Sequence, residues 1–388
     1  MKRTYLDHNA TTPVRPEVAE AMRPYFEGLF GNPNSIHGFG RETRAAVEAA
    51  RARVASLIGA GDPEEIIFTS GGTESDNMAL RGALAAAGGE GHIVTTAVEH
   101  PAVLDTCRAL EAKGVRVTYL PPDRAGRVSP GAVAQAIRPG TRLVSVMWAN
   151  NEVGTLQPIH EIAALCRERG VPFHTDAVQA VGKVPIDVRE AGVDFLSASA
   201  HKINGPKGVV FLYARRGARL EPLLTGGGQE RDLRPGTENV PGIVGLGEAC
   251  RLARAEGPAR ARAIAALRDR LESQLCERIP DVQVNGDPAR RLPGTSNLSF
   301  LGAEGETLLI RLDLEGIAVS TGSACSAGST EPSHVLVAMG LAPEAIRGSL
   351  RFSLGWGSAE EDVDRVLAVL PEAVQRVRAM APGRGARE

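Results

Sequence analysis

The sequence predicts an α/β protein with a mostly parallel sheet covered by helices, followed by a second, smaller α/β layer. From about Glu65 to Tyr213, short apolar runs alternate with helical stretches, which is typical of strand–helix–strand units. A stretch rich in alanine, arginine and leucine then predicts a long helix from about Val240 to Arg278. Shorter strand-like runs follow this helix. With 388 residues, 43% of them hydrophobic, the chain is long enough for one large domain and a smaller one.

Seven apolar runs are the strand candidates of the first layer, and several of them end in polar residues. Open α/β sheets bind their ligands at the carboxyl ends of the strands, so we expect the chemistry there. The runs are IIFT from Ile66, HIVTTA from His92, VRVTYL from Val115, RLVSVMW from Arg142, PFHT from Pro172, DFLSAS from Asp194 and GVVFLYA from Gly208.

The long helix is predicted to connect the two layers. We expect it to break near Gly257 and Pro258, since proline cannot donate a helical hydrogen bond. Beyond it, VQVNG, TSNLSF, IAVS and LRFSL alternate with helical stretches, which predicts the smaller layer. The last residues, APGRGARE, are expected to form a frayed tail.

Composition excludes several classes of partner. A net charge of −2, with both signs spread along the chain, leaves no broad basic face for nucleic acid or an anionic membrane. The N-terminus lacks the apolar core of a signal peptide and no stretch is long enough to span a bilayer, so we expect a soluble protein. The five cysteines have no metal-ligand spacing and predict neither a metal site nor a disulfide framework, which favours the cytoplasm. They are Cys107, Cys166, Cys250, Cys276 and Cys325.

The segment SGGTESDN directly follows the first strand candidate and opens a helical run. Amides at a helix N-terminus bind phosphate, and glycines at Gly71 and Gly72 allow it to approach closely. Thr73 would add a hydroxyl donor. The alternative, that Thr73 only caps the helix, fits these residues equally well.

The segment HTDAVQA places Asp176 and Gln179 just after a buried type of strand. A buried carboxylate needs a positive partner, and the protonated nitrogen of a pyridine ring is one. Asp176 could also be an ordinary helix cap. His100, in TAVEHPAV, follows another strand and could stack on a planar cofactor and move protons, although a lone histidine is more often structural.

The segment SASAHKINGPKG brings Ser199, His201 and Lys202 to the end of one strand. A lysine in a desolvated site near other cations loses its proton readily and can attack an aldehyde. Cys325 lies in STGSAC among small, polar residues, which suits a nucleophile that has to move. The other four cysteines lie in helical patterns and are expected to be structural.

Six motifs together resemble the cysteine desulfurase family, the class-V aminotransferase branch of the fold-type I pyridoxal-phosphate enzymes. The resemblance covers nearly the whole chain, with the motifs in the family's order and spacing. They are YLDHNATTP, GGTES, SAHKINGPKG, GGGQERDLRPGTEN, STGSAC followed by EPSHVL, and RFSLG.

The resemblance implies roles for the candidate residues. Lys202 would bind pyridoxal 5′-phosphate covalently, and His100 would stack on its ring and assist proton transfer. Asp176 would pair with the ring nitrogen and Gln179 with the ring hydroxyl. The cofactor phosphate would be held by Gly72, Thr73, Ser199, His201 and, from a second subunit of a homodimer, Thr237.

The resemblance also implies the reaction. Asn151 would lie beside the cofactor and, with Arg351, receive the carboxylate of L-cysteine, which an arginine matches with a planar fork of donors. Cys325, as thiolate, would take the sulfur as a persulfide, release L-alanine and pass the sulfur to an acceptor such as an iron–sulfur scaffold protein. STGSAC resembles the group that contains the NifS-like and IscS-like enzymes. The chain ends at ARE without the extension with which IscS-like members contact that scaffold, so the acceptor stays open.

Two alternatives compete with this interpretation. A selenocysteine lyase, or another pyridoxal-phosphate C–S lyase, would share the scaffold, although Cys325 favours desulfuration. A non-catalytic scaffold for sulfur transfer is disfavoured, because all the candidate catalytic residues are present. We expect a large cofactor-binding domain from residues 16–258, and a small domain from residues 1–15 and 259–388 that carries Cys325.

Overall fold

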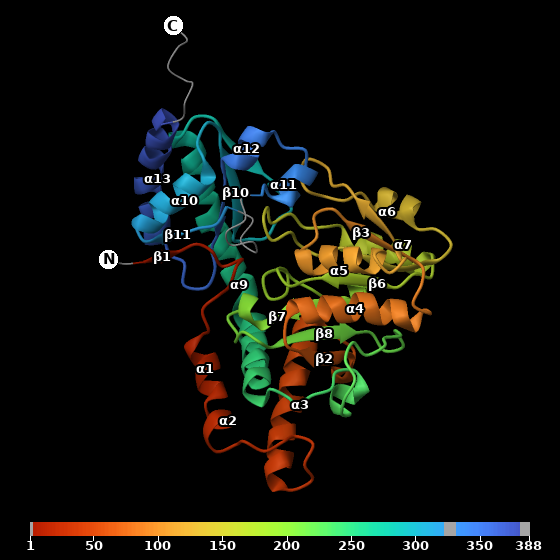
Figure 1. The fold of residues 1–388 in the computed structure, drawn as a ribbon. Helices are drawn as coiled ribbons and strands as arrows, with labels where there is room; N and C mark the ends of the chain where they lie inside the picture. The colour runs from red at the N-terminus through yellow and green to blue at the C-terminus, as the bar shows by residue number, and fades with distance from the viewer. Residues whose placement is uncertain (1–2, 322–330, 381–388) are drawn as a thin grey trace.

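All seven strands predicted for the first layer form one sheet in the computed structural model of the chain, which describes residues 3–321 and 331–380 (Figure 1). Their order across the sheet is β2-β8-β7-β6-β5-β3-β4. Neighbouring strands run parallel, except that β8 is antiparallel to both β2 and β7. The predicted α/β class with a mostly parallel sheet is therefore confirmed. The strands are β2 (Ile66–Thr69), β3 (His92–Thr96), β4 (Arg116–Leu120), β5 (Thr141–Ser145), β6 (Phe173–Asp176), β7 (Phe195–Ser199) and β8 (Val210–Ala214).

Helices cover both faces of this sheet. They are α1 (Pro16–Met22), α2 (Pro24–Glu27), α3 (Gly38–Ile58), α4 (Gly72–Ala86), α5 (Pro101–Glu111), α6 (Pro130–Ala136), α7 (Ile159–Glu168), α8 (Val188–Ala191) and α9 (Val240–Arg278), with the short 3₁₀ turns η1 (Pro63–Glu65), η2 (Ala200–Lys202) and η3 (Gln229–Asp232). In β2, Ile66 and Phe68 pack into a core with α3, α7 and α9, while Ile67 between them packs with α4 and α5. Strands buried on both faces are apolar along their whole length, which explains the unbroken apolar runs in the sequence.

The predicted smaller layer is a three-stranded antiparallel sheet formed by β12 (Ser349–Ser353), β10 (Thr295–Phe300) and β9 (Val282–Asn285), in that order. The remaining predicted run, IAVS, forms β11 (Ile317–Ala318), which pairs in parallel with β1 (Thr4–Tyr5). The start of the chain is thereby fixed beside its C-terminal part. Helices α10 (Gly305–Leu314), α11 (His334–Ala338), α12 (Pro343–Arg347) and α13 (Glu360–Met380) complete this layer.

The break predicted near Gly257 and Pro258 is wrong, because α9 continues through the proline. Its first part packs on α1 and α3, and its second part on α13 and β10 (Figure 1). Packing on both sides of Pro258 offsets the one helical hydrogen bond that the proline cannot donate. The helix thus joins the two layers as predicted, whereas the domain boundary at residue 258 stays a prediction.

Residues 3–321 and 331–380 contain no helix that is both long enough and apolar enough to cross a membrane. Cys325 and the predicted tail APGRGARE lie outside the described residues.

Candidate active site

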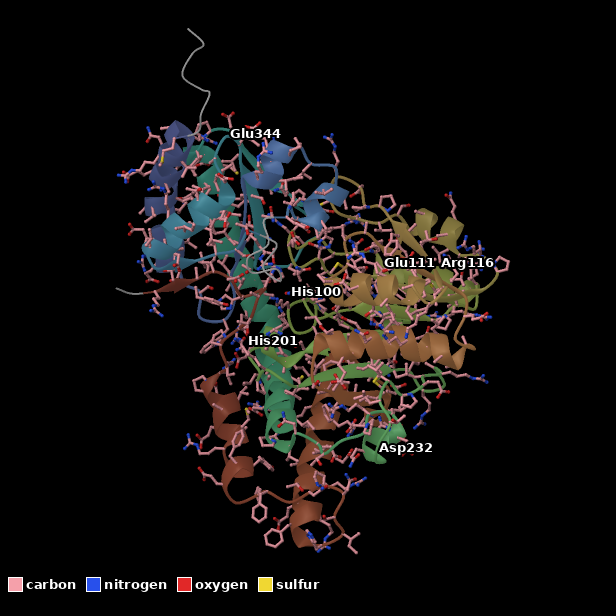
Figure 2. The ribbon with its side chains drawn as sticks, viewed as in Figure 1. His100, Glu111, Arg116, His201, Asp232 and Glu344 are labelled. Carbon is pink, nitrogen blue, oxygen red and sulfur yellow. The ribbon has the colours of Figure 1, made fainter. Side chains whose placement is uncertain are left out.

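A cavity of about 260 Å³ lies at the carboxyl ends of β2, β3, β6 and β7. Figure 2 shows His100 and His201 near the middle of the molecule, in the region where the two layers meet. The structure brings together every predicted site residue except Thr237 and Cys325. Those that line the cavity are Gly72, Thr73, His100, Asn151, Asp176, Gln179, Ser199, His201, Lys202 and Arg351.

One wall of the cavity is the N-terminus of α4. Gly71 is the N-cap residue, and no side chain accepts a hydrogen bond there. Thr73 therefore does not cap the helix, and the alternative weighed for it is wrong. Because the first backbone N–H groups of a helix have no partner within the helix, this wall offers donors to an anion. Ser199, at the end of β7, and Thr73 add hydroxyl groups to the same cavity.

Asp176 and His100 are fixed by local backbone contacts. Asp176 Oδ1 accepts from the backbone N–H of Val178 at 2.9 Å, so it closes a turn; the next helix, α8, begins only at Val188. Burial raises the pKa of Asp176, while the interactions with His100, with the backbone N–H of Val178 and with Lys202 oppose that shift. His100 is the N-cap of α5, where its Nδ1 accepts from the backbone N–H of Ala102 at 3.1 Å. The proton of the neutral ring is therefore assigned to Nε2.

Asp76 also lines the cavity, although the sequence analysis gave it no role. Its side chain is 2% exposed, and its Oδ1 lies 3.6 Å from Nε2 of His174. Burial lowers the pKa of His174 to about 3, so this imidazole is neutral at pH 7. Burial, and then the charge of Asp176, raise the pKa of Asp76 well above its usual range. The neutral form of Asp76 is therefore favoured, whereas His100 and Lys202 favour the charged form of Asp176, which suits Asp176 for pairing with a bound cation.

Another wall of the cavity is formed by Asn9 and Ala10 of the N-terminal segment, which hydrogen-bond Lys202. Lys202 Nζ donates to the backbone carbonyl oxygens of Asn9 at 2.5 Å and Ala10 at 2.8 Å. Gln179 Nε2 donates to the same Asn9 oxygen at 2.9 Å. Burial, with nearby lysines, lowers the pKa of His201 to about 4, so a neutral imidazole lies beside Lys202. Asn9 was not among the predicted site residues, although the motif YLDHNATTP contains it.

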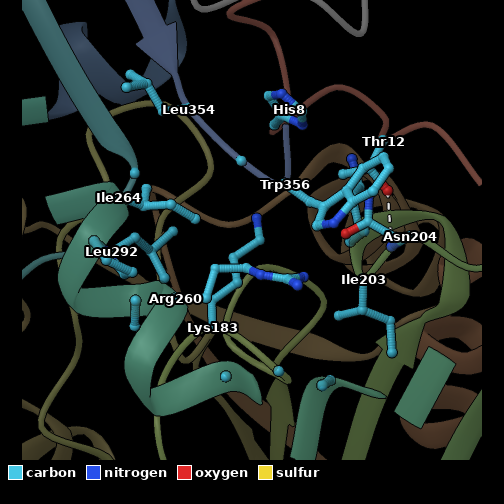
Figure 3. A pocket seen from close by; sticks show the side chains of 18 of the residues that line it. His8, Thr12, Lys183, Ile203, Asn204, Arg260, Ile264, Leu292, Leu354 and Trp356 are labelled. Atoms are coloured by element: carbon cyan, nitrogen blue, oxygen red, sulfur yellow. Dashed lines mark hydrogen bonds between the residues drawn. The ribbon is translucent and has the colours of Figure 1, made fainter. Parts of the chain in front are cut away.

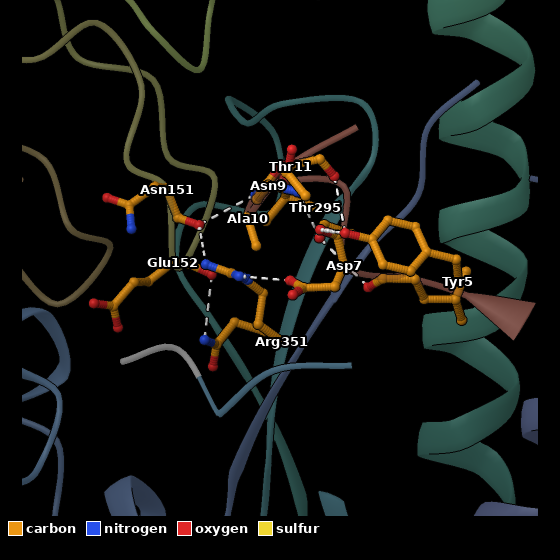
Figure 4. Close-up of polar contacts among 12 residues, drawn as sticks. Tyr5, Asp7, Asn9, Ala10, Thr11, Asn151, Glu152, Thr295 and Arg351 are labelled. Carbon is orange, nitrogen blue, oxygen red and sulfur yellow. Dashed lines mark hydrogen bonds and ion pairs between the residues drawn. The ribbon is translucent and has the colours of Figure 1, made fainter. Parts of the chain in front are cut away.

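Arg351 projects from β12 into a network of polar groups (Figure 4). It is 1% exposed; Nη2 contacts Asp7 Oδ1 at 2.7 Å and Nη1 donates to the Asn151 backbone oxygen at 2.9 Å. Its Nε is buried without a hydrogen-bond partner. Two of the five N–H donors of the guanidinium thus hold it at the cavity wall, and the remaining donors suit a carboxylate ligand.

Two predicted residues are not placed in the cavity. Thr237 is exposed in the segment between η3 and α9 and does not line it. Cys325 lies outside the described residues. Within residues 3–321 and 331–380, no group of three or more histidine, cysteine, aspartate or glutamate side chains could hold a metal ion.

Comparisons with known proteins agree with the motifs. The family model described as aminotransferase class-V matches residues 4–366. The chain is 53% identical over 382 residues to the cysteine desulfurase IscS of Methanosarcina thermophila, covering 98% of this chain and 94% of that protein. The cysteine desulfurase IscS of Dictyoglomus turgidum is 51% identical over 384 residues, covering 98% and 97%. A solved structure of a NifS-like protein superposes with a TM-score of 0.91 at 39% identity. The match covers 97% of this chain and 100% of that chain. The chain therefore belongs to the aminotransferase class-V family.

Proposed function

We propose that this protein is a cysteine desulfurase that uses pyridoxal 5′-phosphate, converts L-cysteine to L-alanine and leaves the sulfur as a persulfide on Cys325. One observation carries the proposal: an amine, a buried carboxylate, a helix N-terminus and an arginine line the same cavity. They are Lys202, Asp176, the start of α4 and Arg351. The similarity to cysteine desulfurases over 98% of the chain supports the same reaction.

The described residues fit the cofactor. The α4 N-terminus, which has no side-chain cap, suits a phosphate, with Thr73 and Ser199 as further donors. Asp176 suits a protonated ring nitrogen, because its own pKa is raised unless a cation comes close. When bound, pyridoxal phosphate withdraws electrons from the Cα–H bond of an amino acid joined to it.

The chain's own residues then bind the substrate and move its protons. Arg351 binds the substrate carboxylate, helped by Asn151, and so fixes the orientation of Cα. The amine of Lys202 takes the Cα proton, and the neutral imidazole of His201 beside it adds no competing charge. His100 carries a proton on Nε2 and can donate it within the cavity.

Contacts on both sides of Cys325 support its role. On the N-terminal side, the backbone of Ser320 exchanges two hydrogen bonds with that of Arg351, at 3.2 Å and 2.6 Å. On the C-terminal side, the Ser333 hydroxyl donates to the buried carboxylate of Glu152, next to Asn151. Ser320 and Ser333, described residues on either side of Cys325, thus contact residues that adjoin the substrate site, and we propose that Cys325 takes the sulfur there.

A homodimer would explain the position of Thr237. We propose that Thr237 reaches the phosphate in the partner's cavity, since it lies outside the cavity of its own chain. An apolar surface supports association: Phe26, Phe30, Ile36 and Phe39 are all more than half exposed, and two of these rings stack at 5.5 Å. Sedimentation should therefore give a mass near twice 40.8 kDa.

Subunit mixing tests the shared site. A Thr237→Ala variant should bind pyridoxal phosphate about tenfold more weakly, because one charge-assisted hydrogen bond is lost. Mixed with an inactive Lys202→Ala chain at limiting cofactor, it should regain activity, because one of the two sites in a mixed dimer would be intact. Activity that never exceeds the sum of the separate variants would contradict a shared site.

We propose that the protein acts in the cytoplasm and passes its sulfur to an acceptor protein such as an iron–sulfur scaffold. The two IscS relatives and the thiol at Cys325 favour cysteine over selenocysteine as substrate. A direct test is the absorption spectrum of the purified protein before and after L-cysteine, with alanine and sulfide measured under reductant. A cofactor band that responds to cysteine, with equal amounts of alanine and sulfide, is expected. Selenocysteine turnover with none on cysteine would instead favour a selenocysteine lyase.

Arg351→Gln should raise the KM for L-cysteine by about 10- to 100-fold, because a charged hydrogen bond contributes roughly 1.5–3 kcal/mol. The kcat should fall less, since Lys202 is unchanged. Arg351→Lys keeps the positive charge but loses the planar pair of donors, so its KM should lie between that of the parent protein and that of Arg351→Gln. An unchanged KM in Arg351→Gln would exclude Arg351 from carboxylate binding.

A further inference from the structure

A second, smaller cavity lies on the other side of Lys202. Its volume is about 70 Å³, and Asn9 and Lys202 line both this cavity and the larger one. Figure 3 shows Lys183 and Arg260 on one side of the small cavity, with His8 and Trp356 facing them. Lys183 is the second lysine in its wall. None of the roles proposed above involves Lys183.

Lys183 differs from the two arginines of this cavity, Arg15 and Arg260, in its partners. Its Nζ donates to Gln179 Oε1 at 2.7 Å and to Asn9 Oδ1 at 3.2 Å, and both are neutral amide oxygens. Arg15 is paired with Glu17 at 2.6 Å and with Glu256 at 2.7 Å, and Arg260 also pairs with Glu256. Carboxylates therefore balance the two arginines, whereas the hydrogen-bond partners of Lys183 are uncharged.

These contacts join Lys183 to Lys202. Gln179 accepts from Lys183 through Oε1 and donates through Nε2 to the Asn9 carbonyl, the same oxygen that accepts from Lys202. Asn9 binds Lys183 through its side chain and Lys202 through its backbone. The Lys183 bond also decides which end of the Gln179 carboxamide points to Asn9, because an ammonium can only donate.

The charges of the two amines interact. Burial lowers the pKa of Lys183 to about 7, and the charges of Lys202 and Arg351 add to this shift. When two ammonium groups lie close together, each favours the neutral form of the other, and the pair titrates as a unit. The other titratable or charged groups that line the two cavities with these amines are His8, Arg15, Asp76, His100, Asp176, His201, Arg260 and Arg351.

We propose that Lys183 is a positioning residue for Lys202: it orients Gln179 beside the reactive amine, and its charge influences the protonation of that amine. When one of the two lysines is protonated, the other loses its proton more readily. This inference rests on the proposed role of Lys202 as the amine that binds the cofactor.

Labelling of the cofactor-free protein tests the coupling. Acetic anhydride acetylates only neutral amines, so mass spectrometry of Lys202 across a pH series gives its titration midpoint. In Lys183→Met the side chain at position 183 is uncharged, whereas in Lys183→Arg it is always positively charged. The Lys202 midpoint should therefore be about one pH unit higher in Lys183→Met than in Lys183→Arg, with the parent protein between them.

Lys207→Met is the matched control, because Lys207 is exposed and follows Lys202 closely; its Lys202 midpoint should equal that of the parent. Thermal unfolding of each variant shows whether it folds. If Lys183→Met does not fold, the difference in Lys202 midpoint between Lys183→Arg and the parent protein decides the test. Equal midpoints in the folded variants would overturn the inference. Failure of the parent's Lys202 to react with pyridoxal phosphate would instead count against the proposed function.

Discussion

Replacing Lys202 by alanine should lower sulfur release from L-cysteine by about 10⁴-fold or more, because one amine serves both as the attachment point of the cofactor and as the base. Lys202 is the lysine that lines the larger cavity. Lys183, the nearest candidate to replace it, lies on the small cavity and is held by Gln179 and Asn9. Among the residues that the structure describes, no second lysine lines the larger cavity to take over its role.

The Lys202→Ala protein should remain folded. The amine donates to two backbone carbonyl oxygens, of Asn9 and Ala10, beside a cavity that admits water, so water can replace the amine at both oxygens. Pyridoxal phosphate should bind to it without a covalent link and wash out on dialysis. Lys207→Ala serves as the control and should retain parental activity. Desulfuration by the Lys202→Ala protein at the parental rate would refute the assignment of this residue.

The sheet could be predicted because its physical cause is local. A strand buried on both faces must be apolar along its length, as Ile66, Ile67 and Phe68 show by packing into two different cores. The positions of Asp176 and Lys202 followed from the rule that ligands gather at the carboxyl ends of strands. One local rule failed at Pro258, where packing of α9 on both sides outweighs the lost hydrogen bond.

The missed residues depend on contacts between distant parts of the chain. Asn9 reaches Lys202 because the N-terminal segment is fixed beside the cavity by the pairing of β1 with β11 and by the hydrogen bonds of His8 and Asn9 to Ser353. Asp76 appears in the sequence as one more polar residue of a helix, and only burial beside His174 and Asp176 distinguishes it. The local sequence pattern carries no information on such contacts between distant segments. Asn9 and Asp76 could therefore be recognised only from the folded structure.

Cys325→Ala should leave the cofactor absorbance and its first response to L-cysteine intact, while persulfide formation and sulfide release fall by about 10³-fold or more. The thiolate is the nucleophile, so another cysteine could substitute only if it were both deprotonated and near the cavity. Burial raises the pKa of Cys107 and of Cys166 to about 12 and raises that of Cys250 further. These three thiols are protonated at neutral pH.

Cys276 provides the matched control. It is exposed in α9, which makes it the most accessible thiol of residues 3–321 and 331–380, but it does not line the cavity. Cys276→Ala should therefore release sulfide at the parental rate and carry as much persulfide as the parent by mass spectrometry. A persulfide that survives in Cys325→Ala and disappears in Cys276→Ala would mean that sulfur leaves the cavity before a protein thiol accepts it. Loss in Cys325→Ala alone would place sulfur capture at the substrate site, where Arg351 and Glu152 hold the two flanks of the Cys325 segment.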